Sequence, residues 1–197
     1  MNLQIILGQI AGLVSLVAFL PYIYLVFQKK IKPNIATWII WTSVNTLVLV
    51  SYYESGARTT IWVPLVYVIQ DLLIVAFSIR SGYIKWNVLD KMCMIGAVAG
   101  IILWLVTKNP VNALLFSLLI DVCGVFPTVR HALQKPHEEF LLSWLLIVLG
   151  SLINIFALTS WSFELSVYPI YMFFGNLVIL LSLVMGKFYK NRAFIKK

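Results

Sequence analysis

The chain has 197 residues, of which 61% are apolar and only 11% are charged. Soluble domains average roughly 45–50% apolar and about 25% charged residues, so this composition excludes an ordinary soluble protein. The formal net charge of +8 comes from 15 basic and 7 acidic residues, which raises the question of where the basic residues lie.

Seven apolar stretches have the length of a membrane-spanning helix, which is about 20 residues. They cover residues 4–27, 35–53, 60–79, 89–107, 111–133, 140–159 and 165–186. Charged residues, glycine, proline or asparagine bound each stretch. The sequence therefore predicts an all-α integral membrane protein with seven transmembrane helices in a lipid bilayer, and the short connectors leave no room for a separate soluble domain.

The basic residues divide unequally when the connectors are assigned alternately to the two sides of the membrane. Thirteen of the 15 fall on one side, and only Arg58 and Lys108 fall on the other. Because an excess of Lys and Arg marks the cytoplasmic side, we expect the N-terminus outside and the C-terminus in the cytoplasm, in a plasma (inner) membrane. Topology then explains the positive charge, and no nucleic-acid partner is expected.

An internal repeat relates the first three stretches to the last three. At an offset of 106 residues the aligned pairs are Pro21 with Pro127, Lys29 with Lys135, Thr37 with Ser143 and Trp38 with Trp144, and at an offset of 105 they are Pro64 with Pro169 and Asp71 with Asn176. Two repeats of three helices in the same orientation need one extra crossing between them, which predicts an inverting linker helix. We therefore expect two parallel three-helix bundles, residues 1–82 and 109–187, joined by a linker over 83–108 and followed by a basic cytoplasmic tail over 188–197.

This pattern resembles the PQ-loop superfamily and, within it, the SWEET and SemiSWEET sugar transporters. The resemblance covers the whole chain and rests on Pro21 and Pro127, each in the first helix of a repeat and followed by a basic connector. Tyr22 and Thr128 stand where the family has glutamine after that proline. The resemblance implies a bundle of three, one and three helices that transports a small solute.

The same resemblance points to a binding position in each repeat. An asparagine in the third helix of each repeat lines the central site of the sugar transporters, and Asp71 and Asn176 take those places here. Proton-coupled members of the superfamily, such as the lysosomal cystine exporter, carry acidic residues in their membrane helices. The resemblance therefore leaves both a facilitator and a proton-coupled carrier open.

Two acidic residues, Asp71 and Asp121, lie inside predicted membrane spans. A charge at that depth costs at least ~2.5–3.5 kcal/mol on insertion scales, so each carboxyl should face a wet cavity, be paired or carry a proton. The predicted spans offer no Lys or Arg partner at that depth. Both residues are therefore candidates for proton coupling, and a hydrogen bond to a neighbouring helix is the structural alternative, of equal weight for Asp121.

Polar and aromatic residues share single faces of the predicted helices. We expect a substrate-binding site formed by Asp71, Asn176, Asn45, Tyr52 and Tyr67. Transporters built from repeats place their sites near the middle of the bilayer. Aromatic faces with amide and carboxyl groups suit a sugar, or a zwitterion whose amine meets Asp71.

Four further residues are candidates for a hinge or a gate. Pro21 and Pro127 interrupt helical hydrogen bonding and could serve as hinges, or they could only shape the bundle. Trp38 and Trp144 lie near the cytoplasmic ends of their helices, where an aromatic belt is expected and a cytoplasmic gate is the alternative.

These observations predict a membrane transporter of a small polar solute, sugar-like or zwitterionic, that works by alternating access, with proton coupling left open. The alternatives are a non-transporting seven-helix receptor or sensor on the same fold and a vitamin-precursor transporter of the nicotinamide riboside type. A retinal photoreceptor is excluded because residues 165–186 contain no lysine. We expect no enzyme activity, catalytic residue, metal or cofactor, and nothing in the sequence indicates an oligomer.

Overall fold

A computed structural model describes residues 3–30, 32–80, 82–86 and 88–195, and within these residues every regular element is a helix. The helices are α1 (Leu3–Phe27), α2 (Ile35–Glu54), α3 (Trp62–Ser78), α4 (Val88–Thr107), α5 (Pro110–Gln134), α6 (Leu141–Phe156) and α7 (Phe163–Ile195). The prediction of an all-helical chain with seven helices is confirmed for this part of the chain. The helix bounds agree with the predicted stretches, except that α7 continues through residues 188–195, which were expected to form a separate tail; the last two residues of that tail lie outside the described residues.

Four of the helices are long and apolar enough to cross a membrane, with α7 contributing its Phe163–Tyr189 part. The other three are α1, α2 and α5. Three shorter apolar helices, Trp62–Ser78, Met94–Thr107 and Leu141–Phe156, pack beside them. This composition makes the chain a membrane protein.

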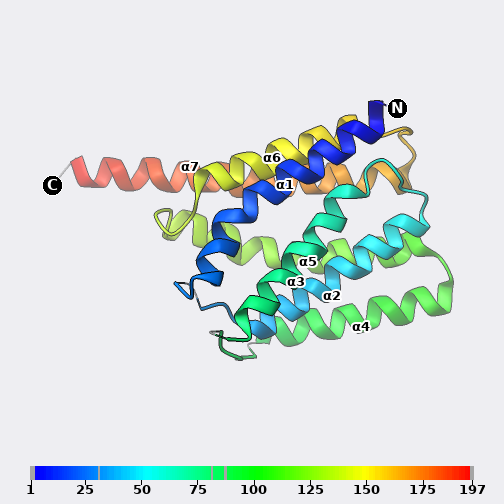
Figure 1. Cartoon of the computed structure of the whole chain (residues 1–197), viewed down its shortest axis with the longest axis horizontal. Coiled ribbons are helices and arrows are strands. Elements are labelled where there is room, and N and C mark those ends of the chain that lie inside the picture. Colours follow the sequence, from blue (N-terminus) through cyan, green and yellow to red (C-terminus); the bar gives the residue numbers. More distant parts are fainter. Residues whose placement is uncertain (1–2, 31, 81, 87, 196–197) are drawn as a thin grey trace.

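The connectors gather at the two ends of the bundle (Figure 1). The α1–α2, α3–α4 and α5–α6 connectors lie at the end where α7 finishes, and the N-terminus and the other three connectors lie at the opposite end. We call the first of these the basic end, because its connectors carry Lys29, Lys30, Lys32, Arg80, Lys85 and Lys135. The opposite end carries Arg58 and Lys108.

Helices α3 and α7 each pack against two other helices. The α3 helix packs against both α1 and α2, and α7 packs against both α5 and α6. Two further contacts, α1 with α6 and α2 with α5, join these groups, and α4 lies along α5 and α2. All six helices other than α4 therefore surround the space between the two groups.

Small residues allow α1 to approach its neighbours closely. Gly8, Ala11, Gly12 and Ser15 are all buried in α1. A methyl group added at Gly8 would overlap the main-chain carbonyl oxygen of Thr59. The position of α1 beside α3 therefore depends on the absence of a side chain at Gly8.

Candidate functional site

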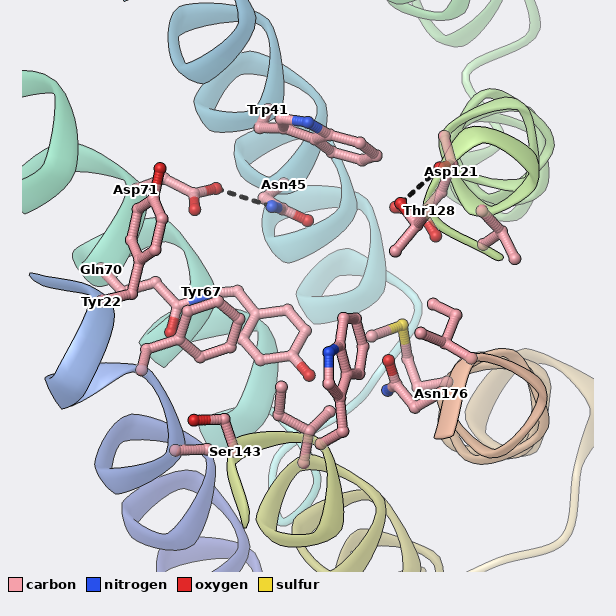
Figure 2. A pocket seen from close by; sticks show the side chains of 18 of the residues that line it. Tyr22, Trp41, Asn45, Tyr67, Gln70, Asp71, Asp121, Thr128, Ser143 and Asn176 are labelled. Carbon is pink, nitrogen blue, oxygen red and sulfur yellow. Dashed lines mark hydrogen bonds between the residues drawn. The ribbon is translucent and has the colours of Figure 1, made fainter. Parts of the chain in front are cut away.

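A cavity of about 330 Å³ lies between the helices in the half of the bundle nearer the basic end (Figure 2). Its walls come from α1, α2, α3, α5, α6, α7 and the α5–α6 connector; the lining residues are Ala18, Phe19, Tyr22, Trp38, Trp41, Asn45, Tyr67, Gln70, Asp71, Asp121, Gly124, Val125, Thr128, Glu139, Phe140, Ser143, Trp144, Ile147, Met172, Asn176 and Ile179. Glu139 and Phe140 belong to the connector at the basic end. The cavity therefore runs from the middle of the helices to that end.

Asp71 and Asn45 face each other across the interface of α3 and α2. Asn45 Nδ2 donates a hydrogen bond of 2.7 Å to Asp71 Oδ2, as Figure 2 shows. Only 2% of Asp71 is exposed, so its carboxyl group is held inside the bundle. Its hydrogen-bond partner is a neutral amide. Among the described residues, no cationic side chain pairs with this carboxyl group.

Asp121 lies on the opposite wall, on α5 (Figure 2). Its Oδ2 accepts a hydrogen bond of 2.6 Å from the Tyr171 hydroxyl of α7. The partner is again neutral. The helix-to-helix hydrogen bond expected as a structural alternative is present, and Asp121 also lines the cavity, so the two interpretations of this residue are compatible.

Asn176 and Tyr67 complete the polar middle of the cavity. Asn176 Nδ2 donates to Ser151 Oγ at 3.2 Å, between α7 and α6. The Tyr67 ring packs edge-on against Phe19, with ring centroids 6.0 Å apart, and Figure 2 shows its hydroxyl pointing into the cavity. Four of the five residues predicted to bind substrate, Asp71, Asn176, Asn45 and Tyr67, therefore meet in one cavity.

Tyr52 is the exception, and the structure corrects its predicted place. It is fully buried at the opposite end, where its hydroxyl donates to the main-chain oxygen of Leu165 at 2.6 Å and pairs with Thr60 Oγ1 at 2.7 Å. Its ring lies 5.0 Å from that of Tyr168, centroid to centroid. Residue 52 shares a helical face with Asn45 but lies about 10 Å further along the axis, beyond the end of the cavity. Tyr52 therefore helps to close the opposite end instead of lining the site.

Removing the Tyr52 hydroxyl is expected to weaken this closed end. The Tyr52→Phe substitution keeps the packing of the ring but leaves a buried carbonyl and a buried hydroxyl with one partner fewer, which costs about 1–3 kcal/mol. Thermal unfolding of the purified protein should show the loss. The matched Tyr53→Phe variant, at an exposed neighbouring position, should unfold like the wild type; equal unfolding of both variants would contradict the role given to Tyr52.

Trp38 and Trp144 both line the cavity near its basic end. The Trp38 ring lies 5.5 Å from the Tyr22 ring, and Trp144 Nε1 donates to Glu139 Oε2 at 2.9 Å. These positions differ from a lipid-facing aromatic belt, because both rings contribute to the cavity wall. They lie where the gate alternative requires them, and gating by either residue stays a prediction.

Glu139 also connects the cavity mouth to α5. The two ring nitrogens of His131 lie 2.9 Å from Glu139 Oε1 and 3.0 Å from Glu138 Oε2. The pKa of Glu138 lies below the ordinary glutamate value because its carboxylate accepts hydrogen bonds first from Lys135 and then from His131. Since the pKa is lowered, Glu138 is ionised at neutral pH, and its pairing is lost only as the pH falls below the usual glutamate range of about 4.3.

The two prolines occupy different surroundings from the cavity residues. Pro21 lies within α1, which bends in its last third (Figure 1), and borders a groove on the outside of the bundle between α1 and α6. A missing N–H at this position accounts for the bend. Pro127 falls within α5, and its side chain lies outside the described residues. A hinge at either proline stays a prediction.

Three residues that the sequence argument did not select contribute to the site. Gln70 lines the cavity, is 2% exposed, and its Oε1 atom has no hydrogen-bond partner in the described part of the chain. Glu139 lines the mouth, and Tyr171 binds Asp121. Gln70 had a signal in the sequence, because it and Asp71 form a polar pair in the middle of an otherwise apolar helix. Glu139 had none, because connectors commonly carry acids.

Comparison of the chain with protein-family models, with curated proteins and with solved structures gives no match. The function proposed for this protein therefore rests on the geometry of the cavity. Among the described residues, no group of three or more His, Cys, Asp and Glu side chains is arranged to hold a metal ion.

Proposed function

We propose that this protein is a membrane transporter that moves a small polar solute through the central cavity by alternating access. One observation carries the proposal: the cavity joins buried polar residues in the middle of the helices to one end of the bundle, while packed side chains fill the other end. Val48, Tyr52, Leu114, Leu118 and Tyr168 belong to that filled end. A site reached from one side at a time is what alternating access requires.

The buried polar groups also favour a functional cavity over a purely structural one. Acidic and amide side chains inside a membrane bundle are costly, and those that persist commonly mark a solute or proton pathway. Asp71 and Asp121 both face the cavity. Proton coupling through either carboxyl is part of the proposal as an alternative to a simple facilitator.

We also propose that the chain consists of two parallel three-helix repeats with α4 as the inverting linker. The helix contacts support this arrangement, because α3 contacts α1 and α2 as α7 contacts α5 and α6, and the α1–α6 contact corresponds to the α5–α2 contact. Two hydrogen bonds are related in the same way. The bond from Asn45 to Asp71 and the bond between Ser151 and Asn176 join residues at offsets of 106 and 105.

The cavity wall supports the repeat independently of the helix contacts. Fourteen of the lining residues form seven pairs at the offsets found in the sequence: Ala18 with Gly124, Phe19 with Val125, Tyr22 with Thr128, Trp38 with Trp144, Trp41 with Ile147, Tyr67 with Met172 and Asp71 with Asn176. Corresponding positions in the two repeats thus contribute to the same cavity. On this basis the likeness to the PQ-loop and SWEET transporters is part of the proposal, as is a cytoplasmic basic end, which makes the described state open to the cytoplasm.

The test combines side-specific labelling with flux. In a background with Cys93→Ser and Cys123→Ser, we expect Ser143→Cys at the cavity mouth to react with a membrane-impermeant thiol reagent from the cytoplasmic side only. Ala57→Cys, which replaces a residue 1% exposed in the filled end, should be protected until a transported solute is added. Reaction of both cysteines at once in the absence of solute would indicate a channel and contradict alternating access.

Flux identifies the solute and separates the competing functions. Purified protein in liposomes should show counterflow of at least one member of a panel of sugars, amino acids and vitamin precursors, with and without a pH gradient. Solute-dependent protection of Ser143→Cys without any counterflow would favour a receptor or sensor on the same fold. Counterflow of a pyridine nucleoside alone would favour the vitamin-precursor alternative.

A further inference from the structure

We propose that the cavity selects a small organic cation that carries N–H donors. This inference rests on the proposed function, because it names the class of solute for the same cavity. Three kinds of observation carry it: the uncompensated carboxyl groups, the oxygen atoms in the wall that accept hydrogen bonds, and the aromatic walls.

The carboxyl groups give the cavity an excess of negative charge. Asp71, Asp121 and Glu139 all line it, and none of the described residues that line it is a lysine or an arginine. Glu139 is paired with His131 at the mouth. Among the described residues, Asp71 and Asp121 are hydrogen-bonded to neutral groups, those of Asn45 and Tyr171. A cation bound between the two aspartates would supply the positive charge that the protein does not place beside them, because buried charges are stable only when they are paired.

Four hydrogen-bond donors in the wall bond to acceptors of the protein itself. Asn45 donates to Asp71, Asn176 to Ser151, Thr128 to the carbonyl of Gly124 and Trp144 to Glu139. One buried acceptor, Gln70 Oε1, has no hydrogen-bond partner among the described residues. Carboxylates, amide oxygens and this unpaired oxygen all accept hydrogen bonds, so the complementary ligand is rich in donors.

Aromatic rings form much of the remaining wall. Five of them are indole or phenol rings, those of Tyr22, Trp38, Trp41, Tyr67 and Trp144. The faces of such rings attract cations, and desolvated pairs contribute about 2 kcal/mol. An anion would meet carboxylates and ring faces, both of which repel it. The volume of about 330 Å³ suits a compact ligand of one ring.

Three molecules of nearly equal shape test the charge preference: benzamidinium, benzamide and benzoate, with charges of plus one, zero and minus one. Binding to the purified full-length protein is measured by calorimetry and by protection of Ser143→Cys from the thiol reagent. We expect benzamidinium to bind at least about tenfold more tightly than benzamide, and benzoate not to bind at millimolar concentration. Equal binding of benzamidinium and benzamide, a preference for benzoate, or no binding of any of the three would each overturn the inference.

Charge-removing variants locate the preference in the cavity. Asp71→Asn and Asp121→Asn should each weaken benzamidinium binding at least about fivefold and leave benzamide binding unchanged within about twofold. Glu54→Gln removes an exposed acid at the other end of α2 and should change neither. If benzamidinium bound both aspartate variants as tightly as the wild type, the inference would be wrong. Counterflow of a neutral sugar with no benzamidinium binding would overturn the inference and leave the transporter proposal intact.

Discussion

Replacing Asp71 by asparagine is expected to lower solute counterflow at least about tenfold. The substitution keeps the size of the side chain and an oxygen that can accept the bond from Asn45, so the cavity should keep its shape. What it removes is the charge, and hydrogen bonds to charged groups contribute about 1.5–3 kcal/mol, or roughly 10- to 150-fold in affinity. Counterflow into liposomes at matched protein content measures the loss.

Two further variants show whether the loss comes from the cavity charge. Glu54→Gln removes an exposed acid from the end of α2 and should retain wild-type flux. The double variant Asp71→Asn with Asn176→Asp moves the carboxyl to the cavity-lining position on α7 and should recover part of the flux. Full activity of Asp71→Asn alone would show that the central role given to this residue is wrong.

Replacing Gly8 by alanine is expected to destabilise the protein by at least about 2 kcal/mol. The added methyl group would overlap the carbonyl oxygen of Thr59, which is main chain and cannot rotate away. Overpacking of this kind typically costs about 1–3 kcal/mol when side chains can yield, and backbone yields less easily. For a chain of this length, 2 kcal/mol corresponds to a fall of about 4–8 °C in Tm. Thermal unfolding in detergent provides the measurement.

The matched control is the same substitution in α7. An alanine methyl group at Gly175 would have no neighbour within 4 Å. Because glycine inside a helix is less stable than alanine by about 0.5–1 kcal/mol, Gly175→Ala should leave Tm unchanged or raise it slightly. A Gly8→Ala protein as stable as Gly175→Ala would contradict the close approach of α1 to Thr59.

The sequence was sufficient to predict the helices and most of the candidate substrate-binding residues in the cavity, because both follow from regular spacing along the chain. Runs of apolar residues predict helices, and residues seven apart share a helical face. Asp71 and Asn176 were selected because an offset of 105 residues relates them in the sequence, and the structure brings both to one cavity. Four of the residues predicted to bind substrate lie together for this reason.

Two features could not be predicted from these regularities: how far along a helix the cavity reaches, and which side chains pair with one another across a connector. Tyr52 shares a helical face with the cavity residue Asn45, but it lies in the end of the bundle that is filled by packed side chains. Its local sequence does not indicate how far along the helix the cavity extends. His131 pairs with Glu138 and Glu139 because the path of the connector between α5 and α6 brings them together, and residue spacing alone does not indicate that path.

Four of the seven residue pairs of the cavity wall differ in the chemistry of their two members. The first member of four pairs is aromatic, at Phe19, Tyr22, Trp41 and Tyr67, and its partner is aliphatic, a thioether or a hydroxyl, at Val125, Thr128, Ile147 and Met172. The aromatic rings of these four pairs therefore all come from α1, α2 and α3. A bound molecule with two unlike ends would have a single favoured orientation, so the two mirror-image forms of a chiral solute should bind with different affinities.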